Sequence, residues 1–255
     1  MRGGNMNPSD EPHDNLHTLH AEEERLRDAS LTLIGKQEDL RDHLVIVHEA
    51  MNAIFAFTQE HVHGSDDELT LQLLGIRLFN DAAASIKLAL SGYYQKAFVH
   101  VRDIVETYFL LDYLRSNPGR IAVWKGATKK QRLNDFGPSR IRDALDKRDG
   151  YTEGMRKAIY DLISEHASHA TYRGFQMASQ DGLGKLGPFM DEAKLQAWLE
   201  EMAKRFGHAA IVLLSDFEGA DPRLDATRAH YLAAVNAWGK KYYGPSFPKG
   251  PGAAG

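Results

Sequence analysis

The chain has 255 residues, of which 43% are hydrophobic and 26% are charged, and it contains no cysteine. This length is ample for a buried core, and both fractions are ordinary for a globular protein. The net charge of -4 predicts no general attraction to nucleic acid or anionic membrane. The lack of cysteine excludes disulfides, thiolate metal sites and a thiol nucleophile.

The ends of the chain differ in composition from its middle. Residues 1–14 are polar and lack the apolar core of a secretory signal, and the tail over 244–255 is rich in Gly and Pro. We expect both ends to be disordered and residues 15–243 to form a single helical domain. No run of about 18 apolar residues is present, so no membrane-spanning helix is predicted and the cytoplasm is the expected location.

Apolar residues at intervals of seven predict one long helix over residues 15–61. They are Leu19, Leu26, Leu33, Leu40, Val47 and Ile54. Such a repeat keeps one stripe of a helix against a partner helix. The neighbouring stripe is apolar only in its second half, which leaves two interpretations open. The favoured one is a helix packed on its own bundle, and the other is an arm that pairs two copies into a homodimer.

Further helices are predicted from residue 65 onward. Ser65 followed by Glu68 has the form of a capping box and opens a helix to about Leu90. We expect its inward face to be Leu69, Leu73, Ile76, Phe79, Ala83, Ile86 and Leu90. A third helix over about 93–115 is apolar on nearly every face, and shorter helices follow. The sequence therefore predicts an all-α helical bundle with a long N-terminal helix and one long Gly-rich loop over 171–190.

Two short motifs match known site patterns but lack the sequence context that those sites need. Residues 182–187 match G-x-G-x-x-G, but a helix is predicted upstream where a dinucleotide site needs a strand, and Pro188 follows the last Gly. Glu60 and His63 have the E-x-x-H spacing of di-iron carboxylate proteins, which need that pair twice. Because a second pair is absent, we predict no metal and no other cofactor, and a di-iron protein is only a remote alternative.

Two groups of polar residues mark the candidate site. One is a charged pair on the otherwise apolar third helix, where a part-buried charge needs a partner. The other group ends a later helix just before the Gly-rich loop. We expect the two groups to form one pocket for an anionic ligand, with the loop as its lid; the residues are Arg102, Glu106, Tyr160, Ser164, His166 and His169. The competing interpretation is a structural polar network that only fixes helix register.

The same residues carry a resemblance. Residues 92–114 are similar to a helix shared by a group of uncharacterised bacterial all-helical proteins, in which A-x-x-x-x-R-x-x-x-E precedes aromatic residues and a Tyr, a Ser-Glu pair and a His follow. The matching positions are Ala97, Arg102, Glu106, Tyr160, Ser164, Glu165 and His169. The resemblance covers about residues 69–172. Members of this group are often described as HEPN-like, and some lie near toxin or phage-defence genes. The activity of this group is not established, so the resemblance implies a helical fold first; a metal-independent ribonuclease is the enzymatic alternative that it suggests.

HEPN ribonucleases carry the motif R-x₄₋₆-H, in which the His acts as a base and the Arg steadies a phosphate. Arg41 with His48 and Arg223 with His230 have this spacing. In a chain with 12 histidines, roughly two such pairs arise by chance. The leading prediction is therefore a cytosolic bacterial binding or regulatory module that forms homodimers. A HEPN-like ribonuclease, with RNA as partner, is the alternative.

Overall fold

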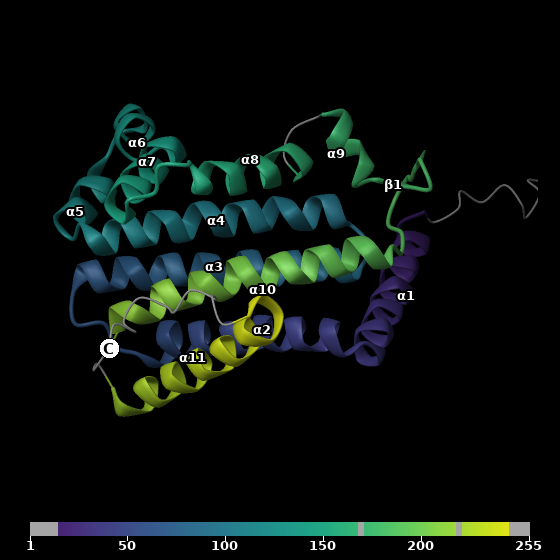
Figure 1. The fold of residues 1–255 in the computed structure, drawn as a ribbon, viewed down its shortest axis with the longest axis horizontal. Helices are drawn as coiled ribbons and strands as arrows, with labels where there is room; N and C mark the ends of the chain where they lie inside the picture. Colours follow the sequence, from purple (N-terminus) through teal and green to yellow (C-terminus); the bar gives the residue numbers. More distant parts are fainter. Residues whose placement is uncertain (1–14, 168–170, 218–220, 245–255) are drawn as a thin grey trace, which may run out of the picture.

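The computed structural model describes residues 15–167, 171–217 and 221–244, and it confirms the all-α fold (Figure 1). In chain order the helical elements are α1 (Asn15–Lys36), α2 (Glu38–Phe55), a π-helical turn (Ala56–Glu60), α3 (Asp66–Leu90), α4 (Tyr94–Ser116), α5 (Gly119–Gly126), α6 (Lys129–Asp135), α7 (Pro138–Asp149), α8 (Met155–Ala167), α9 (Tyr172–Gln176), α10 (Glu192–Leu214), a 3-10 turn (Ser215–Phe217) and α11 (Pro222–Tyr243). Over the described ranges, none of these helices is both long and apolar enough to cross a membrane. The predicted disordered segments, 1–14 and 244–255, lie outside the described residues except for Gly244.

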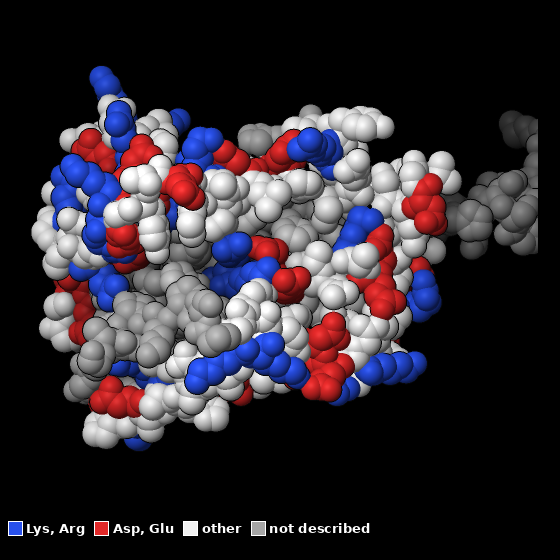
Figure 2. Space-filling model, in the orientation of Figure 1, with Lys and Arg blue, Asp and Glu red and all other residues white. Residues whose placement is uncertain are grey.

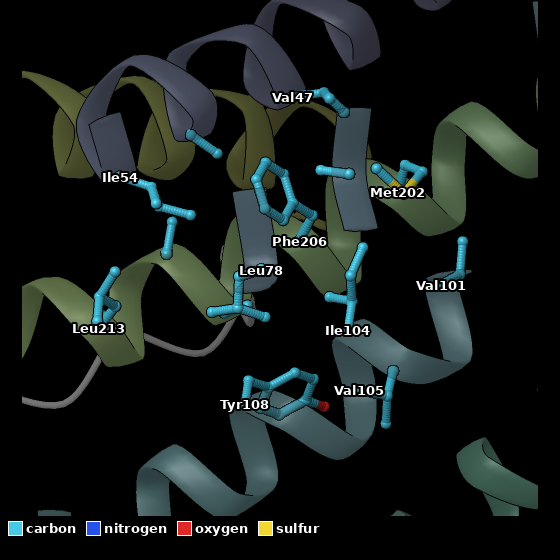
Figure 3. Close-up of a cluster of buried hydrophobic side chains, with 14 of the residues drawn as sticks. Val47, Ile54, Leu78, Val101, Ile104, Val105, Tyr108, Met202, Phe206 and Leu213 are labelled. Carbon is cyan, nitrogen blue, oxygen red and sulfur yellow. The ribbon is translucent and has the colours of Figure 1, made fainter. Parts of the chain in front are cut away.

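The core lies where α2, α3, α4 and α10 meet. Figure 3 shows side chains from these four helices pointing toward one another, among them Val47, Ile54, Leu78, Ile104, Phe206 and Leu213. Burying each such side chain stabilises the fold by about 1.5–3 kcal/mol. Helices α7 and α8 pack on the outer side of α4, and α11 packs on α2. Helix α4 is thus central, as its apolar sequence predicts.

The first helical segment differs from its prediction. The expected continuous helix over 15–61 is divided at Gln37, whose backbone is extended (φ -110°, ψ 125°), and α1 crosses one end of the bundle (Figure 1). Gly35 weakens the end of α1, and the acidic residues Glu38 and Asp39 favour a new helix N-terminus. Leu40, Val47 and Ile54 are fully buried inside the chain. This part of the heptad stripe therefore packs within the bundle and is not an arm for a second copy.

Helix α3 also corrects a prediction, because its buried face is not the expected one. The residues that reach the core are Leu71, Leu74, Leu78, Ala82, Ser85 and Ala89. Of the face predicted to point inward, only Leu90 is buried; Phe79 and Ile86 are partly buried against the core, and Leu73 is 56% exposed. Helix α3 therefore has apolar residues on two sides, and one of these sides faces out of the bundle.

The Gly-rich segment over 171–190 is more regular than predicted. It contains α9 and a small antiparallel hairpin of β1 (Ser179–Gln180) and β2 (Leu183–Gly184). Asp181 (φ 53°) and Gly182 (φ 77°) form its two-residue turn, and positive φ at both positions is what a type I′ turn requires. The Asp-Gly dipeptide is the sequence signal for this hairpin.

Candidate functional site

The structure brings three of the six predicted site residues together. Arg102 on α4 pairs with Glu106 on the same helix (2.7 Å) and donates to the hydroxyl of Tyr160 on α8. Its guanidinium also lies 5.0 Å from the centre of the Tyr160 ring. Arg142 on α7 approaches that ring as well, at 4.1 Å, and is itself buried. These contacts join α4, α7 and α8, which a structural polar network would also do.

Two of the other three predicted residues, Ser164 and His166, form no hydrogen bond or ion pair with this group. Ser164 is buried, and its hydroxyl has no hydrogen-bond partner among the described residues. His166 lines a separate cavity of about 370 Å³ between α8 and α10, where its Nδ1 lies 2.8 Å from the carbonyl oxygen of Leu162. His169 lies outside the described residues. The single pocket built from all six therefore stays a prediction in its complete form.

The expected lid contacts the beginnings of α4 and α10. Gln95 of α4 donates to the carbonyl oxygen of Gly174 (3.0 Å), and Lys194 of α10 donates to that of Ser179 (2.9 Å). Both contacts lie at the end of the bundle where α1 crosses (Figure 1). The segment is thus anchored there by side-chain to backbone hydrogen bonds.

Neither R-x₄₋₆-H pair forms a site with the other polar groups. Arg41 donates to the carbonyl oxygen of Gly35 (2.7 Å) in the kink between α1 and α2. Arg223 pairs with Asp221 (3.1 Å), the N-cap of α11, and His230 pairs with Glu49 (3.5 Å). Each arginine thus stabilises a helix end. Among the described residues, no group of three or more His, Asp and Glu side chains is placed to hold a metal ion.

A larger hollow of about 620 Å³ lies between α4, α8, α10 and α11. We call it the arginine hollow. Its charged lining consists of five cationic side chains and two carboxylates: Arg115, Arg148, Arg156, Lys204 and Arg205, with Asp112 and Asp149. Figure 2 shows charged side chains of both signs intermingled over α5–α7 and along α10. Aromatic side chains complete the wall, among them Phe109, Tyr151 and Trp238.

Ion pairs fix one wall of the arginine hollow. Arg148 of α7 forms a bidentate pair with Asp112 of α4, at 2.7 and 2.9 Å. Arg156 of α8 pairs with Asp146 of α7 (2.6 Å) and with Asp149. Hydrogen bonds from Arg148 and Arg156 outweigh burial and lower the pKa of Asp149. Planar, charge-assisted pairs of this kind hold their partners in defined positions. The wall is therefore rigid before any ligand arrives.

On the α10 side of the arginine hollow, the polar side chains have fewer hydrogen-bond partners among the described residues. Arg205 uses Nε to donate to Glu201 (3.0 Å), and the described residues provide no hydrogen-bond partner for its two terminal nitrogens. His208, one turn later, lies edge-on to Tyr108 (5.2 Å between ring centres). The side chain of His208 is exposed along the hollow, and desolvation by the surrounding walls is the main cause that lowers its pKa; Asp112 opposes this shift, while Arg205 and Arg156 add to it. A lowered pKa favours the neutral form of the imidazole.

Sequence reasoning missed the arginine hollow although a usable signal was present. Asp112 and Arg115 interrupt the apolar face of α4, and Lys204, Arg205 and His208 interrupt that of α10. The rule that singled out Arg102 and Glu106, a charged group on a central helix, applies equally to them. What the sequence lacks is the pairing of α4 with α10 that brings the two groups to one place.

No family model matches the chain, and no curated protein or solved structure matches it either.

Proposed function

We propose that the protein is a cytosolic binding module whose arginine hollow holds an anionic small molecule. The single observation that supports this is Arg205 in the wall of the hollow, whose terminal nitrogens have no hydrogen-bond partner among the described residues. A guanidinium whose two terminal nitrogens are left to donate suits a phosphate or carboxylate group. The volume, about 620 Å³, lies within the range of small-molecule sites.

The lining also indicates the shape of the ligand. Phe109, Ile159 and Ile211 give the hollow an apolar surface beside the cationic groups. A ligand with an apolar or aromatic body and one anionic group would use both. Mononucleotides, with a planar base and a phosphate, are the first class of compound to test.

Titration calorimetry with AMP and with adenosine tests the proposal. We expect AMP to bind and adenosine to bind at least tenfold more weakly, because a charge-assisted hydrogen bond contributes about 1.5–3 kcal/mol. The variant R205Q should lose affinity for AMP by a similar factor. Its control is R223Q, which removes an exposed arginine outside the hollow. If neither nucleotides nor sugar phosphates bind, or if R205Q binds them as the wild type does, the proposal is wrong.

A second candidate function is metal-independent RNA cleavage, and the observation that favours it is the lowered pKa of His208 beside Arg205. A neutral His208 can accept the proton of a 2′-hydroxyl. The 2′-oxygen then attacks the adjacent phosphorus, the bond between phosphorus and the 5′-oxygen breaks, the 5′-oxygen takes a proton from water, and a 2′,3′-cyclic phosphate forms. This assignment uses neither R-x₄₋₆-H pair, although it agrees with the ribonuclease activity that the HEPN-like resemblance suggests.

Cleavage of labelled single-stranded RNA in the presence of EDTA tests the second candidate. H208A should abolish cleavage, while H48A and H230A should leave it intact. Loss of cleavage in H48A or H230A would instead assign the activity to an R-x₄₋₆-H pair. If the wild-type protein does not cleave RNA, the second candidate is wrong and only the binding proposal stands.

A further inference from the structure

The outward side of α3 carries apolar residues that the other described parts of the chain cover only in part. Its outward residues recur at intervals of three and four, which places them on one helix face. They are Leu69, Leu73, Ile76, Asn80, Ala83, Ala84 and Lys87, none of which is buried. Phe55 at the end of α2, which is 51% exposed, extends this surface through its contact with Phe79 (6.4 Å between ring centres). We call these residues the α3 face.

The small side chains on this face allow another helix to come close. Leu73 is the most exposed large hydrophobic residue of α3 (56%), and Asn80, Ala83 and Ala84 lie within about three turns of it. When two such helices pack antiparallel, the large residues of one lie against the small residues of the other. The face is thus complementary in shape to a second copy of itself.

We propose that two copies of the chain form a symmetric homodimer through the α3 face, with the two α3 helices antiparallel. The charges at the two ends of the α3 face favour a second copy of the chain over other partners. Asp66 lies in the first turn of α3, where its carboxylate pairs with Lys125 of α5 and is still 78% exposed, and Lys87 is exposed in the last turn, at the opposite end of the stripe. A twofold axis near Ile76 places Asp66 of each copy opposite the partner's Lys87, as an isologous interface requires.

The residue nearest the axis supports the same arrangement. Arg77 would face its own copy and repel it if its side chain pointed outward. Instead, its Nε donates to Thr107 of α4 (3.2 Å), and its guanidinium lies 3.8 Å from Asp103. A membrane is a less suitable occupant, because helices that lie on membranes carry Lys and Arg along their polar flanks. Here the stripe begins with Asp66, Asp67 and Glu68.

Sedimentation velocity over a range of protein concentrations tests the proposal on the full chain. The wild type should reach a dimer of twice 28.5 kDa at micromolar concentration. L73E should remain monomeric, because it places two buried carboxylates near the axis. The control is L133E, the same substitution at a leucine of α6 that is 65% exposed; it should dimerise like the wild type. Circular dichroism checks that each variant is folded.

Charge exchange tests the antiparallel register. D66K and K87D should each weaken the dimer roughly threefold to thirtyfold, because two symmetric contacts turn repulsive. The double variant D66K/K87D should recover most of the affinity, since each new lysine again faces a carboxylate of the partner. Within one chain the two positions lie about 30 Å apart along the helix, so contacts inside the chain cannot produce this rescue. A monomeric wild type, a dimeric L73E or a double variant weaker than both single variants would each overturn the proposal.

Discussion

Arg156 is the side chain whose removal should affect the arginine hollow most. It crosses from α8 to α7, where it pairs with Asp146 and Asp149, and its guanidinium lies 5.1 Å from the ring centre of Tyr151. Arg156→Met keeps most of the apolar stem and removes the charge. The change leaves the carboxylate of Asp146 without its cation, while Asp149 keeps Arg148.

The expected loss in the free energy of unfolding follows from the burial of the Arg156–Asp146 pair. The side chains of Arg156 and Asp146 are only 14% and 12% exposed, so water replaces little of the lost interaction. Breaking a buried ion pair by removing one partner costs about 3–5 kcal/mol. Because both groups keep some access to solvent, we expect the free energy of unfolding to fall by about 3 kcal/mol. For a chain of this size, that lowers the midpoint of thermal unfolding by about 6–12 °C.

Urea unfolding followed by circular dichroism measures the change. R156M/D146N should regain part of the loss, because the double variant no longer buries an unpaired carboxylate. The matched control is K157M at the next residue, which removes a pair between Lys157 and Asp161 that is well exposed and should change stability by less than about 1 kcal/mol. A loss below about 1 kcal/mol in R156M, or no recovery in the double variant, would refute the role assigned to this pair.

Three further predictions concern the core and its edges. Ser85→Ala should cost about 2–4 kcal/mol in urea unfolding, because the buried hydroxyl of Ser85 accepts from Trp198 Nε1 (2.9 Å) and donates to the carbonyl oxygen of Ala97 (2.9 Å). Burial lowers the pKa of His43, whose Nδ1 accepts from Trp238, so the folded state binds a proton less readily than the unfolded state. Stability should therefore fall as the pH drops below about 6.5, and H43Q should reduce this slope in unfolding measured from pH 7 to pH 5. Gly92→Ala should speed proteolysis of 171–190, since Gly92 has φ +87° and an added Cβ would lie 2.5 Å from the carbonyl oxygen of Phe189.

Helix ends were the most predictable part of the fold because their signals are local. Ser65 accepts from the backbone N–H of Glu68 (3.1 Å), as the capping-box pattern predicts. Asp221 caps α11 in the same manner, and Pro222 occupies the first turn of that helix. Each of these contacts spans at most three residues. Local chemistry decides them, whatever the rest of the chain does.

The predictions that differ from the structure failed for another reason, which is that they depend on how the helices pack. The seven-residue stripe runs through Gln37 without a change in spacing, so periodicity alone does not reveal the kink there. On α3, apolar residues occupy two faces, and only the positions of α4 and α10 decide which face is buried. In the candidate site, Arg102, Glu106 and Tyr160 meet because α8 packs on α4, whereas His166 on the same α8 points toward α10. Which helix packs on which is not encoded within one helix.

The two proposed surfaces use opposite sides of the same four-helix core. Helix α10 packs on the buried side of α3, where Gly75 approaches Leu213 so closely that a Cβ would lie 2.8 Å from its side chain. Leu73 is exposed on the far side of α3, while Arg205 and His208 face outward from α10 into the arginine hollow. A dimer formed through the α3 face therefore leaves the arginine hollow of each copy outside the contact between the copies. Because a well-packed core separates the two surfaces, loss of the dimer contact need not disturb the ligand site.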